Sequence, residues 1–224
     1  MSAFDDLFAL SPWMRALDAV QQERVHADLL EREVRAGCYV CRKGEAVEHW
    51  VGVIAGLVKI SSVSVAGKPV TFTGIPAGGW FGEGSMLKEE PRRYDAVALR
   101  DSRIALMPRA TFQWLLDGSI AFNRYLLLQL NERLGQFIGT VEIDRLLGPD
   151  ARVARCLAHL FNPLLYPGVG SRLEISQGEL GFLTGLSRQT VNQALQRLER
   201  DGLLAVQYGS VTVLSLEGLQ KLEG

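Results

Sequence analysis

Long apolar runs are missing from this 224-residue sequence: no stretch of about 18 apolar residues occurs, so no transmembrane helix is expected. The first ten residues carry two aspartates and no basic cluster, which is not the pattern of a secretory signal. We therefore expect a cytoplasmic protein with no membrane partner. Apolar residues make up 47% of the chain and charged residues 22%, which is typical of a globular protein. At roughly 100–200 residues per domain, the length suits two modest domains.

Cysteine is scarce: the three cysteines are an odd number and too few for a disulfide framework. Cys38 and Cys41 form a C-x-x-C pair, a spacing found in redox and metal sites. Gly37–Arg42 is expected to be a strand, on which side chains three residues apart point to opposite faces. An iron–sulfur cluster normally needs four cysteines, and only Cys156 is left. We expect no metal site, since the histidines show no ligand spacing; whether Cys38 or Cys41 is redox-active stays open.

Signatures of common enzymes are also missing. The sequence has no P-loop, no serine-hydrolase elbow, no zinc-protease helix and no paired carboxylates, so we expect no catalytic residues and no enzyme activity. An excess of basic charge is missing as well, because the net charge is −1 and residues 148–224 hold seven Lys/Arg against seven Asp/Glu. Bulk charge therefore gives no support for nucleic-acid binding, and such a function has to rest on local pattern.

The first feature that is present is a β-rich segment. From about Arg35 to Met107, short runs rich in β-branched residues alternate with glycines at roughly 8–12-residue spacing, which is typical of an antiparallel sandwich or barrel. Ala66–Pro69 is predicted to be a hairpin tip, where Gly67 supplies the positive φ that such tips need. A helical prefix, about Pro12–Glu33, is expected to lead into this segment.

A long helix is predicted over residues 119–147, which contain no proline and only two interior glycines. Five apolar residues recur in it at alternating spacings of three and four, the pattern of a coiled-coil seam. They are Leu127, Leu130, Leu134, Phe137 and Val141. At 1.5 Å per residue the helix is about 40 Å long. We expect the seam to be a dimer interface with a second copy; burial against the chain's own β-domain is the alternative, and both can hold at once.

Gly148–Asp150 interrupts the long helix, and Pro149 suits the first turn of a new one, so a domain boundary is placed here. An amphipathic helix is expected over Ala151–Leu160, followed by a loop through Gly170 that contains proline and glycine.

Two helices joined by a tight turn are predicted next. Ser176 followed by Glu179 is a capping box, which begins the first helix. Gly185 lies at the centre of the turn, and Ser187 caps a second helix that runs to about Asp201. This arrangement is typical of a helix-turn-helix.

The second helix separates two kinds of side chain. Val191, Leu195 and Leu198 share one face and are expected to pack inward. The opposite face carries an arginine and several amides, which suit hydrogen bonds to base edges in the major groove. Its members are Arg188, Gln189, Asn192, Gln193 and Gln196. The helix N-terminus and the Ser187 hydroxyl suit a backbone phosphate.

A hairpin follows the two helices. Leu203–Gln207 and Val211–Leu214 are predicted to be short strands around Tyr208–Ser210, forming a wing that contacts the sugar-phosphate backbone. A plain helical hairpin with a solvated face is the competing interpretation, but it does not explain the amide-rich face and the wing together. The candidate DNA-contacting residues are Ser176, Gln177, Ser187, Arg188, Gln189, Thr190, Asn192 and Gln193.

The residues LSRQTVNQALQRLERDGLL, Leu186–Leu204, resemble the recognition-helix pattern of the Crp/Fnr superfamily of bacterial regulators. PAGGWFGEGSMLKEEPRRYDAVAL, Pro76–Leu99, is similar to the cyclic-nucleotide phosphate cassette of that superfamily. The resemblance covers the whole chain. It implies an α+β fold made of a cyclic-nucleotide-binding-like antiparallel β-roll (a jelly roll; 1–118), a dimerisation helix (119–147) and a winged helix-turn-helix (148–224).

The same resemblance implies a homodimer that binds a two-fold operator in double-stranded DNA, with RNA polymerase as a further partner. Arg188, Gln189 and Gln193 would then read bases. Position 189 is often glutamate in the best-known members, so the half-site sequence at that step stays open.

The cassette also makes physical sense by itself, as a site for an anionic effector. Gly82 and Gly84 let backbone N–H groups approach a phosphate, Arg92 or Arg93 can pair with it, and Glu83 can accept from a ribose hydroxyl. The candidate effector-binding residues are Gly82, Glu83, Gly84, Ser85, Arg92, Arg93, Tyr94 and Phe137. Two of these depart from the cyclic-AMP pattern: Tyr94 replaces the hydroxyl residue expected after the arginine, and Phe137 and Ile138 stand where hydroxyls would face adenine.

Several alternatives therefore stay open at the β-roll. A nucleotide-like effector, either a cyclic mononucleotide or a cyclic dinucleotide, competes with an unrelated small effector and with no ligand, and no cofactor is certain. The arginines can equally pair with Glu89 and Glu90. A nucleotide-binding sensor that acts through protein partners is the second functional hypothesis. The operator, the regulated genes and the choice between activation and repression also stay open.

Overall fold

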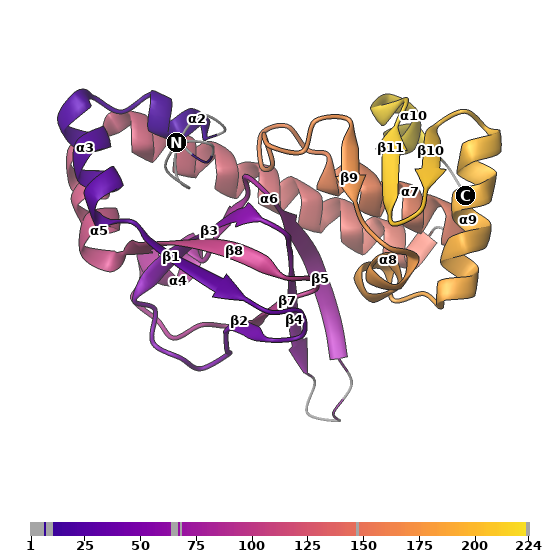
Figure 1. Cartoon of the computed structure of the whole chain (residues 1–224), viewed down its shortest axis with the longest axis horizontal. Coiled ribbons are helices and arrows are strands. Elements are labelled where there is room, and N and C mark those ends of the chain that lie inside the picture. Colours follow the sequence, from indigo (N-terminus) through magenta and orange to yellow (C-terminus); the bar gives the residue numbers. More distant parts are fainter. Residues whose placement is uncertain (1–6, 8–10, 64–66, 68, 147, 223–224) are drawn as a thin grey trace.

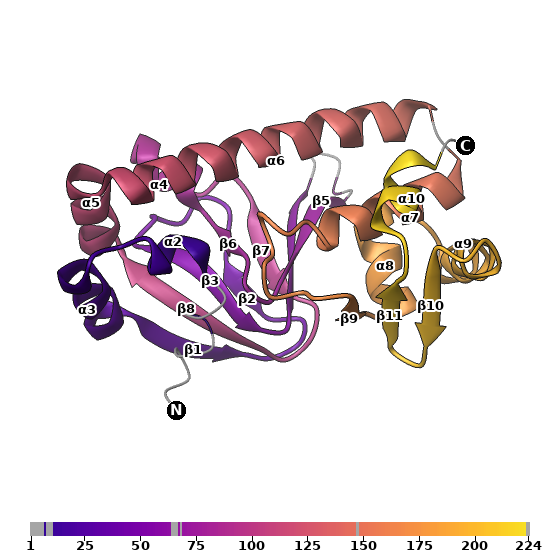
Figure 2. The same ribbon diagram turned by 90° about the horizontal axis from the view of Figure 1, so that it is seen from above.

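The computed structural model describes Leu7 and residues 11–63, 67, 69–146 and 148–222, without the side chains of residues 69 and 141–146. A β-roll with flanking helices forms one half of the molecule, and a winged helix-turn-helix forms the other (Figure 1). The predicted α+β class is confirmed. A long helix, α6 (Ile120–Leu146), runs along one side of the molecule from the β-roll to the winged helix (Figure 2).

Two four-stranded antiparallel sheets make up the β-roll, with strand orders β1-β8-β3-β6 and β2-β7-β4-β5. The strands are β1 (Leu30–Val34), β2 (Tyr39–Cys41), β3 (His49–Ala55), β4 (Leu57–Val63), β5 (Pro69–Pro76), β6 (Trp80–Phe81), β7 (Asp95–Ala98) and β8 (Ser102–Pro108). Their inward side chains, such as Val53, Val58, Ile75 and Ile104, are completely buried. The core of the β-roll thus follows from the alternation of apolar residues along the strands.

The segment before the β-roll differs from the prediction. The helical prefix consists of α2 (Pro12–Arg15) and α3 (Ala19–Asp28), and its predicted extension to Glu33 is wrong, because Leu30–Val34 is strand β1. This strand pairs with β8 in antiparallel register along its whole length. Long-range pairing here overrides the helix propensity of a Leu-Glu-Arg-Glu sequence.

The predicted hairpin tip joins β4 and β5, which pair antiparallel from Leu57 to Val63. Gly67 has φ +74°, the positive value that the sequence required there. Ala66 and Lys68 lie outside the described residues.

An aromatic cluster fastens the helices to one face of the β-roll. The α2 residue Trp13, Trp50 of β3 and Trp80 of β6 are buried, together with Phe112 of α5 (Arg109–Gly118) and Phe122 of α6. The Trp50 and Trp80 rings stack with centroids 4.3 Å apart, and Trp13 meets Trp50 at 5.3 Å. Such ring contacts add stabilisation beyond the large area that each ring buries, so they hold the start of α6 against the β-roll.

The winged helix-turn-helix follows the break after α6. Pro149 takes the first position of α7 after Gly148, as predicted. The helices are α7 (Pro149–Leu160), α8 (Gln177–Thr184), α9 (Arg188–Arg200) and α10 (Leu216–Lys221). The hairpin of β10 (Leu204–Gln207) and β11 (Ser210–Val213) gains a third strand, β9 (Arg172–Glu174), which the sequence had not indicated.

The two halves are packed directly against each other. A Cβ placed on Gly74 of β5 would lie 3.0 Å from Leu160 of α7 and 3.1 Å from Leu183 of α8. A Cβ on Gly79 would lie only 2.8 Å from the ring of Tyr166. The small size of these glycines therefore allows the winged helix to approach β5 and the turn after it.

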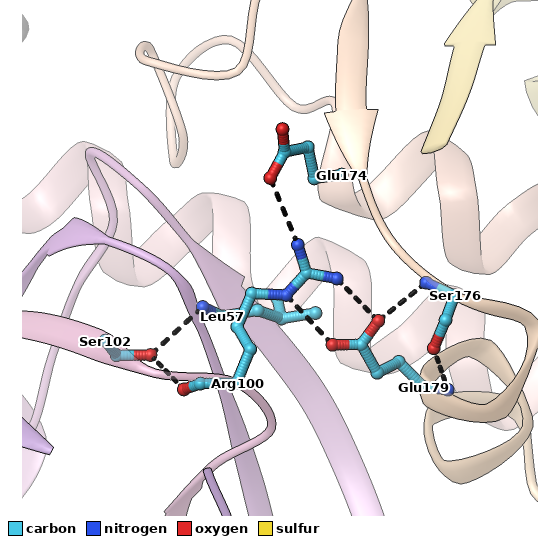
Figure 3. Close-up of polar contacts among 6 residues, drawn as sticks. All are labelled: Leu57, Arg100, Ser102, Glu174, Ser176 and Glu179. Atoms are coloured by element: carbon cyan, nitrogen blue, oxygen red, sulfur yellow. Dashed lines mark hydrogen bonds and ion pairs between the residues drawn. The ribbon is translucent and has the colours of Figure 1, made fainter. Parts of the chain in front are cut away.

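Arg100, on the turn between β7 and β8, adds a polar contact between the halves (Figure 3). Its guanidinium donates two hydrogen bonds to Glu179 of α8, of 2.9 and 2.6 Å, and a longer one of 3.4 Å to Glu174. Glu179 also accepts from the Ser176 N–H at 2.6 Å, while the Ser176 hydroxyl accepts from the Glu179 N–H, which completes the predicted capping box. One carboxylate thus caps α8 and holds it to the β-roll.

The pKa of the Glu179 carboxyl lies below its ordinary value. Burial alone would raise this pKa, but the hydrogen bonds from Arg100 and Ser176 outweigh burial. A group whose pKa is lowered by folding stabilises the folded state above its unfolded pKa, here 4.5, and this stabilisation is lost as the pH falls through the folded value.

Arg100→Gln should lower the free energy of unfolding at pH 7 by about 1–3 kcal/mol, because a partly buried charged hydrogen-bond pair is lost. The difference from the wild type should shrink once the pH falls below about 4. Urea denaturation at pH 7 and pH 3.5 measures both effects. Lys221→Gln, which breaks an exposed pair with Glu217, is the control and should change stability by less than about 0.5 kcal/mol. An equal loss at both pH values would contradict the role assigned to Glu179.

Candidate nucleic-acid interface and effector site

The helix-turn-helix is built by local signals in the sequence. Gly185 ends α8 with φ +68°, a left-handed conformation that suits glycine. The Ser187 hydroxyl accepts from the Thr190 N–H at 3.1 Å and so caps α9. Val191, Leu195 and Leu198 are buried against the rest of the domain. The predicted helix, turn, helix and inner face are all confirmed.

The outer face of α9 divides into free and engaged side chains. Arg188, Gln189 and Gln193 are exposed, and within the described chain no hydrogen bond or ion pair holds their side chains. Asn192 is half-buried instead, and its Oδ1 accepts a hydrogen bond of 2.8 Å from Gln177 Nε2 of α8. Within the described chain, the structure thus leaves these three side chains, and that of the exposed Gln196, free for an external partner, and it uses Asn192 and Gln177 to join the two helices.

Two further predicted residues lie beside these three. The hydroxyls of Ser187 and Thr190 are 2.8 Å apart at the N-terminus of α9, where unpaired backbone N–H groups favour an anion. Ser176 is exposed at the start of α8, but its hydroxyl serves the capping box.

The wing projects beyond the two helices. Tyr208 at its tip is fully exposed, and Gly209 supplies the positive φ of the turn, +73°. Glu199 of α9 accepts a hydrogen bond of 2.7 Å from the Val206 N–H of β10. The wing and the candidate recognition helix therefore form one unit.

Within the cassette, Gly82 has φ +99° and precedes the short helix α4 (Glu83–Lys88). Glu83 is buried and forms an ion pair of 3.1 Å with Arg133 Nε of α6. Burial alone would lower the pKa of Arg133, but the Glu83 carboxylate and nearby tyrosines outweigh burial and raise it. Arg133 also donates to the Trp80 carbonyl. The sequence analysis missed Arg133, because its partner Glu83 lies 50 residues earlier in the chain and no local pattern marks the pair.

The two cassette arginines are placed very differently. Arg92 is buried, donates to the His49 carbonyl at 2.6 Å, and its Nη1 would lie 2.5 Å from a Cβ on Gly82, so the glycine makes room for it. Arg92 Nη1 is buried with no hydrogen-bond partner among the described residues. Arg93 is exposed and forms a two-pronged pair with Glu90, with distances of 2.9 and 2.6 Å. The structure therefore brings Arg92, not Arg93, to Gly82.

The other candidate effector residues surround this point to different degrees. Ser85 is buried within α4, while Gly84 is exposed. Burial and the Glu83 carboxylate raise the pKa of Tyr94, which also interacts with Arg133 and Arg92. Phe137 lies one turn beyond Arg133 on α6 and is 46% exposed.

The predicted seam of α6 faces solvent in the single chain. Leu127, Leu134 and Phe137 are exposed and Leu130 is half-buried, while the side chain of Val141 lies outside the described residues. The opposite side of the helix packs on the β-roll through Phe122, Leu126 and Gln129, whose amide donates to the Trp80 carbonyl at 3.1 Å. Packing against the β-roll thus uses a face of α6 different from the seam.

The two cysteines of the C-x-x-C pair differ in burial, but the predicted strand over Gly37–Arg42 is shorter than expected: β2 covers Tyr39–Cys41, and Cys38 lies just before it. Cys38 is exposed, whereas Cys41 is buried in β2, and burial raises the pKa of its thiol. Burial also raises the pKa of Cys156 to about 12. Among the residues that the structure describes, no group of three or more His, Cys, Asp or Glu is placed to hold a metal ion. In the same part of the chain, no helix is both long and apolar enough to cross a bilayer.

Each half of the chain matches a known protein family. Residues 31–119 match the cyclic nucleotide-binding domain, and residues 151–222 match the Crp-like helix-turn-helix domain. The Cyclic AMP receptor protein of Thermus thermophilus is 29% identical over 170 residues, which cover 76% of this chain and 77% of that protein. The cAMP-activated global transcriptional regulator CRP of Haemophilus influenzae is 28% identical over 165 residues, covering 72% and 73%.

A solved structure agrees with these matches. A transcriptional regulator of the CRP/FNR family from Thermus thermophilus superposes with a TM-score of 0.58 at 26% identity, covering 87% of this chain and all of the other. With its cyclic nucleotide-binding domain, its Crp-like helix-turn-helix and relatives that are transcription regulators, the chain belongs to the Crp/Fnr superfamily of transcription regulators.

Proposed function

We propose that this regulator works as a cytoplasmic homodimer that binds a two-fold operator in double-stranded DNA. The observation that carries the proposal is the outer face of α9, where Arg188, Gln189 and Gln193 are exposed and free of partners within the described chain. Arginine reads guanine and glutamine reads adenine through paired hydrogen bonds in the major groove. We assign these three residues to base contacts and Ser187, Thr190 and the wing to the backbone.

Asn192 and Gln177 take a supporting role in this proposal. Their mutual hydrogen bond of 2.8 Å fixes the angle between α8 and α9. We therefore expect them to orient the reading helix more than to contact bases. Ser176, engaged in the cap of α8, has the same positioning role.

The dimer is proposed from the seam of α6. Leu127 is 67% exposed and Leu134 58% exposed, on a helix whose other side already packs on the β-roll. A second copy that pairs along this seam buries the exposed leucines and places two recognition helices on one side of the dimer. For two-fold readers the half-sites lie about 34 Å apart, one turn of DNA. If the regulator activates transcription, RNA polymerase is its further protein partner.

Effector control is proposed for the cassette. Gly82, Glu83, Arg92 and Tyr94 gather beside Arg133 of α6, so an anionic ligand here would act on the same buried pair that fixes the dimer helix. Such a ligand shifts the population between two packings of α6 and re-aims the recognition helices. We assign no enzyme activity to the protein.

Leu134→Glu should convert the dimer into a monomer. Each copy loses the burial of one leucine, worth about 1.5–3 kcal/mol, so the dissociation constant of the dimer should rise at least about 100-fold. Analytical ultracentrifugation measures the mass of both proteins. Val20→Glu makes the same exchange at an exposed apolar position on α3 and should leave the dimer intact. A wild-type protein that is monomeric at micromolar concentration, or a dimeric Leu134→Glu variant, would contradict the proposal.

Arg188→Ala should weaken binding by about 1–3 kcal/mol at one base pair of each half-site, as for a lost two-pronged contact to guanine. The operator is first selected from random double-stranded DNA with the wild-type protein, and single-base variants are then compared by gel shift. Arg200→Ala, at the other end of the same helix, is the control and should not change base preference. Equal weakening on all sequences would make Arg188 a phosphate contact, and a wild type that selects no sequence would refute the proposed function.

A further inference from the structure

A loop of the winged-helix half lies against the cassette of the β-roll. This docking loop, residues 162–168, follows α7 and reaches back toward the strands of the β-roll (Figure 1 and Figure 2). Tyr166 in the loop is only 2% exposed, and its ring lies against Gly79, the residue before Trp80 of β6. A large side chain of one half of the molecule is therefore buried against the other half.

The turn between β5 and β6 offers the docking loop a surface without side chains. A Cβ placed on Gly79 would lie 2.8 Å from the ring of Tyr166 and 2.7 Å from Ile75. A Cβ on Gly78 would lie 2.9 Å from the backbone nitrogen of Gly168. These distances are shorter than van der Waals contact, so a side chain at either glycine would push the loop away.

Asn162 fixes the shape of the docking loop. Its Oδ1 accepts hydrogen bonds from the Leu164 N–H at 2.9 Å and the Leu165 N–H at 3.0 Å, and its carbonyl accepts from the Tyr166 N–H at 2.8 Å. Its Nδ2 donates to Glu132 of α6 at 2.7 Å. One residue thus shapes the loop and ties it to the long helix, so Tyr166 is held in a defined position.

The hydroxyl of Tyr166 opposes the docking that its ring favours. It is buried and has no hydrogen-bond partner among the described residues. Tyr166 also acts electrostatically on Arg133, the α6 residue that pairs with Glu83 of the cassette. Burial of the ring stabilises the docked loop, whereas a buried hydroxyl without a partner destabilises it. The two effects have opposite signs, so the docked loop is held less firmly than the buried ring alone would hold it.

We propose that Tyr166 is a latch that fixes the winged helix on the β-roll when its ring is docked on Gly79 and frees it when the ring leaves. The unpaired hydroxyl keeps the docked and released forms close in free energy, as a two-state element requires. The latch lies beside the Glu83–Arg133 pair, so a cassette ligand that accepts from the hydroxyl favours the docked form. This last step rests on the proposed function, whereas the latch itself does not.

Hydrogen exchange on the full-length protein, with no DNA present, measures the latch directly. Tyr166→Ala and Gly79→Ala release it from opposite sides, and each should speed exchange in residues 164–169 at least about tenfold. Gly79 does not have a positive φ, so alanine there acts through the collision with the ring. Tyr166→Phe keeps the ring and removes the unpaired hydroxyl, so it should slow exchange in the same residues.

Two controls separate release of the latch from general unfolding. Exchange in the core strands β3 and β8 should be the same in every variant and in the wild type. Tyr39→Ala removes a tyrosine ring that is 46% exposed on β2 and should leave exchange in residues 164–169 unchanged. The proposal is overturned if Tyr166→Ala and Gly79→Ala both leave exchange in the loop within about twofold of the wild type, or if Tyr166→Phe speeds it.

DNA binding tests whether the latch controls the reading helices. On the operator selected with the wild type, Tyr166→Ala and Tyr166→Phe should change the dissociation constant in opposite directions, each by at least about threefold, because they shift the latch in opposite directions. Changes in the same direction would contradict control through the latch. If the wild type selects no operator, the proposed function fails, and the exchange data still decide whether the latch exists.

Discussion

The buried ion pair between Glu83 and Arg133 is the contact on which the arrangement of this molecule depends. It joins the cassette of the β-roll to the long helix α6 at a place where both side chains are largely shielded from solvent, so removal of either group would leave the other charge without its partner. Arg133 also donates to the Trp80 carbonyl, next to the aromatic cluster that seats the start of α6. With that side of the helix held, the leucines of the seam have to face outward, and a second copy can cover them.

The β-roll and the helix-turn-helix pack directly against each other, so a movement of one can be passed to the other. Glycines on β5 and on the turn after it let α7, α8 and Tyr166 approach the β-roll closely. Arg100 donates hydrogen bonds to the Glu179 carboxylate that caps α8. Because α8 and α9 are joined through Gln177 and Asn192, a shift of the β-roll against α8 moves the reading face as well. A ligand at the cassette would therefore have a physical path to the helix-turn-helix.

Elements that rest on local chemistry could be predicted from the sequence. Ser176 with Glu179, Gly185 and Ser187 each act within three or four residues, so the helix-turn-helix followed from the order of residues. The same holds for the break at Pro149. The prediction failed at Leu30–Val34, where the residues favour a helix but β8 offers a partner about 70 residues away in the chain.

The site residues show the same division. The sequence showed which residues belong to the site, but not which partners their side chains contact. Arg93 points outward and pairs with Glu90, whereas Arg92 is buried beside Gly82. Asn192 accepts a hydrogen bond from Gln177. Arg133 had no local signal, because its partner is 50 residues earlier and is brought close only when α6 packs on the β-roll.

The sequence by itself determined the helix caps, the glycine turns, the seam of the long helix and the amide-rich face of α9. These depend on backbone conformation and on the period of a helix, which neighbouring residues decide. Only the tertiary structure decided which charges pair and which polar side chains stay free. Those properties depend on distances between residues far apart in the chain, and such distances exist only once the two halves are packed together.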